Sequence, residues 1–154
     1  MNKRRTEHTT FSIDRVYDFA PSLVFAAWAS ADAKSQWFSG TPDKWTLLER
    51  KLEFRVGGRE LLKGQWQGGP VSTFAGYYYD IVPNERIVYS YDMHQDDTQI
   101  SVSLATVEFR AKATGTVLTF TEQAVFLDDF NDAGGRKHGT GLLLDQLGIA
   151  LSKR

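Results

Sequence analysis

Arg15 and Glu122 form the sharpest candidate pair for chemistry in this sequence. Each is charged at a position where its strand-like segment, Thr9 to Asp18 or Thr116 to Leu127, calls for an apolar inward side chain. A buried charge needs a partner, and the two would meet if their strands are neighbours in a sheet. Such a pair could brace two strands, anchor a carbonyl or carboxylate of a ligand, or transfer a proton. A carboxylate beside an arginine is a poor general base, so we expect no catalytic residue here.

The histidines are too scattered along the chain to form a metal motif. His8, His94 and His138 have no close-spaced ligand partners, and the chain contains no cysteine. The sequence therefore predicts neither a metal site nor a cofactor.

The segment Gly134 to Gly141 lies between a predicted strand and a predicted helix, where a phosphate-binding loop would occur. It lacks the Gly-Lys-Ser/Thr of such loops, and nearby aspartates would repel a phosphate. We interpret the segment as a flexible lid or a helix start, in which His138 is more readily exposed than in contact with a ligand. The chain also lacks the Gly-x-Ser-x-Gly elbow of serine hydrolases.

Length and charge narrow the classes of protein. A chain of 154 residues suits one domain, residues 1–154, and the formal charge of −1 creates no general field for nucleic acid or an anionic membrane. No apolar run approaches the ~18 residues that a membrane helix needs. The lack of cysteine suits a cytoplasmic protein. Aromatic residues reach 13% of the chain, enough to fill a large core or to line an apolar pocket.

The C-terminal segment, Asp132 to Arg154, predicts a long amphipathic helix around which the rest of the chain is organised. One face collects its apolar side chains at helical spacing: Leu143, Leu144, Leu147, Ala150 and Leu151. Several glycines lower its intrinsic helix propensity, so we expect packing to stabilise it. Gly141 and Gly148 lie on nearly one side, where they would permit either close contact with a sheet or a cavity for a ligand.

The preceding chain predicts one strand, two short helices and then six strands, an α+β pattern with an antiparallel sheet curved around the last helix. Glycine, proline and polar turns separate the segments. The two short helices begin after Ala20-Pro21-Ser22 and at about Ala31, the second ending near Trp37. The six later strands are expected at Trp45–Val56, Arg59–Gln67, Phe74–Val82, Glu85–Met93, Gln99–Lys112 and Thr116–Leu127.

The order and spacing of several short motifs resemble the START-like (SRPBCC, birch-pollen-allergen-like) superfamily, and within it the family named for the activator of heat-shock protein 90 ATPase. The chain departs from the family at Leu142, where an aromatic residue is usual, and matches loosely over Trp45 to Glu53. The matching pieces are Arg15 and Tyr17 before Ala20-Pro21, Trp37-Phe38, Val56-Gly57-Gly58-Arg59, Phe74-Ala75-Gly76, Pro83 to Tyr89, Val107-Glu108-Phe109, Gly115 to Thr119, and His138 with Gly141.

The resemblance implies a helix-grip fold, in which a seven-stranded sheet grips the C-terminal helix and places the first and last strands side by side. If the sheet is concave toward the helix, alternation nominates a set of inward residues as a ligand-binding wall, although each could equally belong to a packed core. Leu118 is also expected to point inward. The predicted ligand-binding site comprises Arg15, Tyr17, Trp37, Phe38, Phe74, Tyr78, Tyr89, Tyr91, Phe109, Phe120, Glu122, Gly141, Leu143 and Leu147.

We expect this domain to bind a small apolar or aromatic molecule in a cavity between the sheet and the helix. Fold alone does not select an activity, and the family resemblance leaves two alternatives. One is a module that contacts a chaperone, which predicts a filled core and an exposed patch. The other is an enzyme similar to polyketide cyclases and aromatases, which we favour less. Exposed tyrosines such as Tyr77 and Tyr79 leave the choice between a monomer and a homodimer open.

Overall fold

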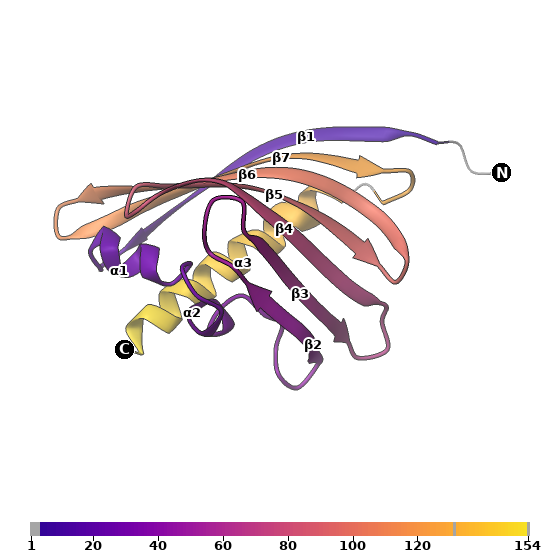
Figure 1. The fold of residues 1–154 in the computed structure, drawn as a ribbon, viewed down its shortest axis with the longest axis horizontal. Helices are drawn as coiled ribbons and strands as arrows, with labels where there is room; N and C mark the ends of the chain where they lie inside the picture. Colours follow the sequence, from indigo (N-terminus) through magenta and orange to yellow (C-terminus); the bar gives the residue numbers. More distant parts are fainter. Residues whose placement is uncertain (1–3, 131, 154) are drawn as a thin grey trace.

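The computed structural model describes residues 4–130 and 132–153, and within them seven strands form one curved antiparallel sheet over a long C-terminal helix (Figure 1). The expected α+β architecture is therefore confirmed. In chain order the elements are β1 (Thr6–Tyr17), α1 (Pro21–Ala26), α2 (Ala31–Ser35), β2 (Trp45–Leu52), β3 (Arg59–Trp66), β4 (Val71–Val82), β5 (Arg86–Gln95), β6 (Thr98–Lys112), β7 (Gly115–Leu127) and α3 (Ala133–Ser152).

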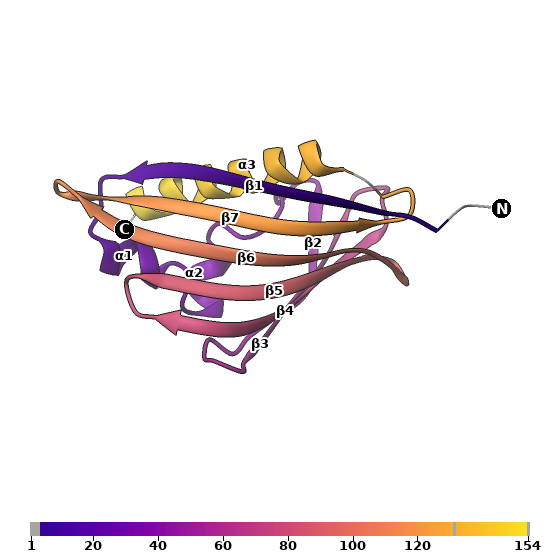
Figure 2. The same cartoon turned by 90° about the horizontal axis from the view of Figure 1, so that it is seen from above.

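The strand order of the sheet is β1-β7-β6-β5-β4-β3-β2 (Figure 2). Strands β2 to β7 follow one another as hairpins, whereas β1 pairs with β7 and so joins the beginning of the chain to its last strand. The expected proximity of the first and last strands is therefore confirmed. Because of this pairing, residues from both ends of the chain lie on the concave face.

The turns explain where the strands end. Asn84 has φ 66° in the turn between β4 and β5, a conformation that asparagine tolerates better than most residues. Strand β2 ends at Leu52, earlier than the expected Val56, because the chain begins to turn at Glu53, whose amide donates to the Arg59 carbonyl. Gly57 has φ +83° within this turn, where a side chain would be strained.

The two short helices lie near the C-terminal end of α3 in both views (Figures 1 and 2). Pro21 occupies the first turn of α1. Amide groups in this turn have no hydrogen-bond partner within the helix, so the helix loses no bond by having proline there. Ser30 caps α2 by accepting a hydrogen bond from the Ala33 amide at 3.1 Å. The second helix ends at Ser35, slightly before the expected Trp37.

Helix α3 runs across the concave side of the sheet, with Leu144, Leu147 and Leu151 fully buried. The predicted apolar face is therefore confirmed, although the last residue of the expected segment, Arg154, lies outside the described residues. Asp132 caps the helix by accepting a hydrogen bond from the Gly135 amide at 3.1 Å.

Two glycines of α3 bring the helix close to β1. A Cβ atom on Gly141 would lie 3.1 Å from Arg15 Nη2, and one on Gly148 would lie 3.2 Å from Tyr17 Cε1. Tyr17 also donates its hydroxyl to the Leu144 carbonyl at 2.7 Å. At both glycines the helix packs closely against the sheet, and Gly141 also lines a surface depression between β1 and α3.

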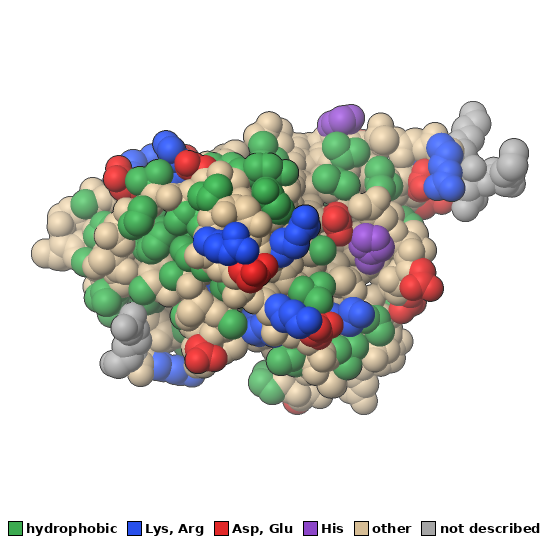
Figure 3. Space-filling view, viewed as in Figure 1, with side chains coloured by type: hydrophobic (Ala, Val, Ile, Leu, Met, Phe, Trp, Pro, Cys, Tyr) green, Lys and Arg blue, Asp and Glu red, His purple; other side chains and the backbone are tan. Residues whose placement is uncertain are grey.

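Charges of both signs are mixed among hydrophobic side chains on the face shown in Figure 3, in keeping with the near-neutral formal charge of −1. Among the described residues, no helix is long and apolar enough to cross a membrane.

We expect Gly139→Ala to raise the free energy of unfolding by up to ~1 kcal/mol, because Gly139 lies within α3 and alanine is the better helix former. A Cβ atom at this position has open space around it within the described structure. The measurement is urea denaturation followed by circular dichroism. Gly115→Ala is the contrasting variant, because its Cβ would overlap the Tyr17 carbonyl, and it should lose ~1–3 kcal/mol. Equal effects of the two substitutions would contradict this packing.

Candidate functional site

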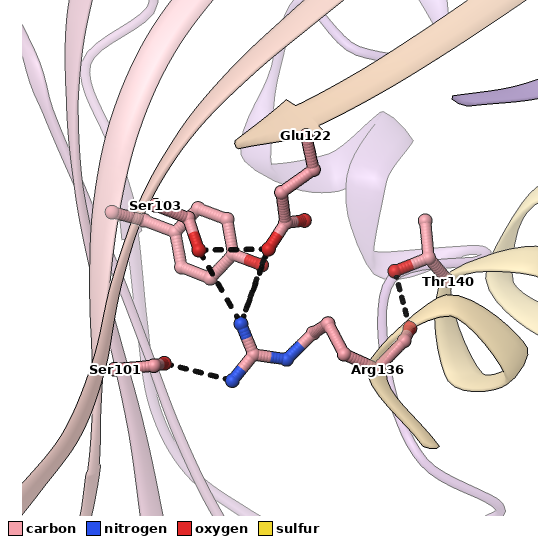
Figure 4. A network of polar contacts seen from close by, with 6 residues as sticks. Ser101, Ser103, Glu122, Arg136 and Thr140 are labelled. Atoms are coloured by element: carbon pink, nitrogen blue, oxygen red, sulfur yellow. Dashed lines mark hydrogen bonds and ion pairs between the residues drawn. The ribbon is translucent and has the colours of Figure 1, made fainter. Parts of the chain in front are cut away.

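A buried carboxylate, Glu122 of β7, organises the polar contacts beneath the first turns of α3. Its side chain is 0% exposed. Its Oε2 atom accepts hydrogen bonds from the Tyr91 hydroxyl and the Ser103 hydroxyl, both at 2.7 Å, and from Arg136 Nη1 at 3.2 Å (Figure 4). Charge-assisted bonds of this kind offset much of the cost of burying the carboxylate.

Arg136 carries the opposite charge from α3 to the sheet (Figure 4). Its Nη2 atom donates to the Ser101 hydroxyl at 2.8 Å, and its guanidinium lies 4.9 Å from the ring centroid of Phe126 and 5.6 Å from that of Tyr91. The Thr140 hydroxyl donates to the Arg136 carbonyl one helical turn later, at 2.9 Å. Arg136 is therefore the polar tether between the start of α3 and the concave face.

The second oxygen of Glu122 is different. Its Oε1 atom is buried and has no hydrogen-bond partner among residues 4–130 and 132–153. Buried polar atoms are nearly always bonded, so such an atom indicates a bound water or a ligand group in the functioning protein. We call Oε1 of Glu122 the open acceptor.

The predicted pairing of Arg15 with Glu122 is wrong. In the sheet Glu122 lies opposite Phe11, and Arg15 lies opposite Leu118, so the two charges are displaced by four residues, or ~13 Å, along the strands. Arg15 instead donates to Asp145 of α3, from Nε to Oδ1 at 2.7 Å, and its Nη2 donates to the Gly141 carbonyl at 3.3 Å. Alternation had identified the face correctly but not the position along it.

A second buried ion pair lies beneath the short helices. Lys34 of α2 is 1% exposed and donates to both oxygens of Glu60 at 2.9 Å. Tyr78 donates its hydroxyl to Glu60 Oε1 at 2.6 Å. The Lys34 ammonium also lies 4.4 Å from the Phe38 ring centroid and 5.5 Å from that of Trp28, close enough for attraction to the ring faces.

Aromatic rings connect these two polar clusters. Tyr91 stacks on Phe74 with 4.6 Å between ring centroids, and Phe74 contacts Phe38 at 5.1 Å. Tyr89 lies between Tyr78 and Tyr91, at 5.6 and 6.1 Å. The structure therefore brings together the sequence-predicted residues Phe38, Phe74, Tyr78, Tyr89, Tyr91 and Glu122.

The remaining predicted residues lie around this group without joining it at one point. Phe109 and Trp37 pack with Trp28 at centroid distances of 6.3 and 4.7 Å, and Phe120 stacks on Phe11 at 6.4 Å. Leu147 is buried and Leu143 partly buried against the same core, while Arg15, Tyr17 and Gly141 form the contact of β1 with α3. Their role in binding stays a prediction.

The inward aromatic residues contact one another, whereas the described depressions lie elsewhere, on the surface. One runs between β1 and α3, with a volume of about 410 Å³, and its walls include Arg15, His138 and Gly141. The other lies beside Trp45 and Trp66 at the ends of β2 and β3. Within the described part of the chain, no three His, Asp or Glu side chains gather as a metal site would require.

Sequence reasoning missed three charged residues of these clusters. Glu60 lies two residues before Leu62 in β3, so alternation could have placed it inward. Lys34 lies in a very short helix and Arg136 among glycines, where no periodic pattern identifies a face. Only the folded chain brings Lys34 to Glu60 and Arg136 to Glu122.

Comparison with known proteins gave consistent matches over almost the whole chain. Residues 18–152 match the family described as Activator of Hsp90 ATPase homolog 1-like protein. An uncharacterised protein from Rhizobium leguminosarum is 41% identical, with 99% of each chain covered and a TM-score of 0.94. The Mll3558 protein from Rhizobium loti is 38% identical over 95% of this chain and 99% of its own, with a TM-score of 0.87.

The fold also extends to more distant proteins. CalU16 from Micromonospora echinospora is 17% identical over 99% of this chain and 87% of its own, with a TM-score of 0.63, a likeness of fold alone. A search of curated proteins found no match.

We expect Lys34→Met to lower the free energy of unfolding by ~3–5 kcal/mol, because it leaves the Glu60 carboxylate buried without its ammonium partner. Adding Glu60→Gln should restore part of this loss, since the amide is uncharged and its oxygen still accepts from Tyr78. Urea denaturation measures both. The exposed pair of Arg86 and Asp80 provides the control, for which Arg86→Met should change stability far less, because water screens the pair. A loss of similar size at both pairs would refute the burial argument.

The buried tyrosines predict a loss of stability in alkali. Burial raises the pKa of Tyr17, Tyr78, Tyr89 and Tyr91 above the ordinary 10.0, and nearby Glu60 and Glu122 add to the effect at Tyr78 and Tyr91. The unfolded chain therefore releases these protons first, and the free energy of unfolding should fall above about pH 10 by ~1.4 kcal/mol per pH unit for each tyrosine.

One buried group has the opposite effect on how the free energy of unfolding changes with pH. Burial lowers the pKa of Lys34, so its contribution to stability rises with pH until the unfolded lysine loses its proton near 10.5. Four tyrosines outweigh one lysine. Phenolate absorbance and circular dichroism, followed together through the alkaline range, should show the buried tyrosines ionising as the fold is lost. Ionisation of all tyrosines while the fold persists would contradict their burial.

Proposed function

This chain belongs to the family of Activator of Hsp90 ATPase homolog 1-like proteins, and we propose that it binds a small aromatic molecule between the sheet and α3. The observation that carries the proposal is the open acceptor, an oxygen of a fully buried carboxylate that the described residues leave without a hydrogen bond. Tyr91 donates its hydroxyl to the other oxygen of the same carboxylate, and Phe74 stacks on the Tyr91 ring. A small-molecule site commonly combines such apolar walls with a few fixed polar groups.

The chemistry of the open acceptor limits what can bind. An ionised carboxylate oxygen accepts hydrogen bonds and cannot donate them, so the ligand must supply an N–H or O–H group. Oε2 of Glu122 already has three donors, which hold the carboxylate in one orientation. A phenol or an aromatic amine supplies both the donor and a ring to lie against Tyr91.

The start of α3 provides a route to this buried site. Gly134, Gly135 and Gly139 reduce the helix propensity of these turns, and the side chains of Lys137 and His138 are exposed. The same turns are tied to the sheet by the polar bonds of Arg136. We expect a ligand to enter past these turns, with Arg136 moving aside and the buried leucines farther along the helix staying in place.

The packed aromatic rings match the filled core expected of a chaperone-contacting module, but the buried open acceptor favours a small molecule over a protein partner. A chaperone would contact exposed side chains, whereas the Glu122 side chain is 0% exposed and lies between the sheet and α3. Binding is therefore the function that this geometry supports best.

The test is a binding comparison between matched aromatic compounds. We expect 4-ethylphenol to bind more tightly than 4-ethylanisole by about tenfold or more, because only the phenol donates a hydrogen bond to the charged open acceptor. Isothermal titration calorimetry measures both, and native mass spectrometry of the protein purified from its own host would show any ligand already bound. Failure of both compounds and of a wider aromatic panel to bind would refute the proposal.

Glu122→Gln is the informative variant. Its amide oxygen can keep the bonds now made by Oε2, while its NH₂ group replaces the open acceptor with a donor. The preference for the phenol should therefore disappear while the protein remains folded. Glu108→Gln, on the half-buried outer side of β6, is the matched control and should keep the preference. An unchanged preference in Glu122→Gln would mean that a bound water satisfies the open acceptor.

A further inference from the structure

Arg50 of β2 presents a second set of unsatisfied polar atoms. Its Nη2 atom donates to the Phe38 carbonyl at 2.8 Å. Its Nε and Nη1 atoms are buried and have no hydrogen-bond partner in the described parts of the chain, residues 4–130 and 132–153. We call Nε and Nη1 of Arg50 the open donors. A guanidinium cannot lose its charge in a protein, so these atoms stay donors at any physiological pH.

The charge around Arg50 is unbalanced. Lys34 and Arg50 are both positive, whereas Glu60 supplies a single negative charge to the cluster that the described residues form. Both oxygens of Glu60 are already bonded to Lys34, and Oε1 also accepts from Tyr78. Glu60 therefore leaves one positive charge uncompensated in a partly buried setting, where electrostatic attraction is stronger than in water.

A series of contacts through Tyr91, Phe74 and Phe38 connects the open acceptor on Glu122 to Arg50, which carries the open donors. Glu122 is bonded to Tyr91, and the steps from Tyr91 to Phe74 and from Phe74 to Phe38 are 4.6 and 5.1 Å between ring centroids. Phe38 then accepts from Arg50 through its carbonyl. A molecule lying along this series of contacts would meet a hydrogen-bond acceptor at one end and a cation at the other.

We propose that the ligand is a hydroxylated aromatic carboxylic acid, with its hydroxyl on Glu122 and its carboxylate on Arg50. This inference rests on the proposed function and adds the second end of the molecule. A carboxylate carries one negative charge, which matches the one uncompensated positive charge, whereas a phosphate would bring more charge close to Glu60. The planar guanidinium suits a carboxylate better than it suits a neutral carbonyl.

Three related compounds separate the two ends of the ligand. The probes are 4-hydroxycinnamic acid, its methyl ester and cinnamic acid, titrated by calorimetry near neutral pH. The ester removes the negative charge but keeps the hydroxyl, and cinnamic acid does the reverse. We expect the hydroxy acid to bind about tenfold or more tightly than either relative, since each loses one charge-assisted contact.

Arg50→Gln is the decisive variant, with Arg55→Gln as its control because Arg55 is an exposed arginine paired with Glu53 near the same strand. Arg50→Gln should abolish the preference for the acid over the ester, and circular dichroism should show that the variant is folded. Arg55→Gln should keep the preference.

The outcomes distinguish this inference from the proposed function. If the ester binds the natural protein as tightly as the acid, or Arg50→Gln keeps the preference, the carboxylate site is refuted while aromatic binding stands. If none of the three probes binds while 4-ethylphenol does, the inference is overturned and the proposed function stands, whereas failure of 4-ethylphenol and the wider aromatic panel as well overturns both. Equal binding of cinnamic acid and its hydroxylated form would refute the contact with Glu122.

Discussion

The structure depends on the contacts that hold α3, a helix of low intrinsic propensity, against the seven-stranded sheet. Helix α3 contains many glycines, so its own hydrogen bonds stabilise it poorly. Buried leucines, the hydroxyl bond from Tyr17 to Leu144 and the ion pairs of Arg15 and Arg136 fix it to the concave face. The glycines that weaken the helix also permit this approach, because Gly141 and Gly148 leave room for the side chains of β1.

The core of this protein also contains buried charged side chains. A sheet and a helix can close on apolar side chains alone, and replacing buried ion pairs by apolar residues is often neutral or stabilising. This protein instead buries Glu122 and the Lys34–Glu60 pair among aromatic rings. Such groups are costly unless they are paired, and the unsatisfied atoms on Glu122 and Arg50 lie beside the two clusters. The binding role that we propose accounts for charges placed there.

The family relationship and the polar core answer different questions. Family membership and the likeness to the two Rhizobium proteins account for the fold over nearly the whole chain. They assign no ligand, because folds of this kind serve several functions. The case for a ligand comes from individual atoms of this chain: one oxygen of Glu122 and two nitrogens of Arg50.

The sequence predicts the order of the elements, the inward aromatic residues of the strands and the apolar face of α3, because these follow from local periods of two and 3.6 residues. It did not determine which charges meet. Arg15 and Glu122 share a face and neighbouring strands, yet strand register separates them and α3 supplies the partner of each, Asp145 and Arg136. Whether long side chains meet depends on strand register and on the placement of distant elements, and both are properties of the folded chain.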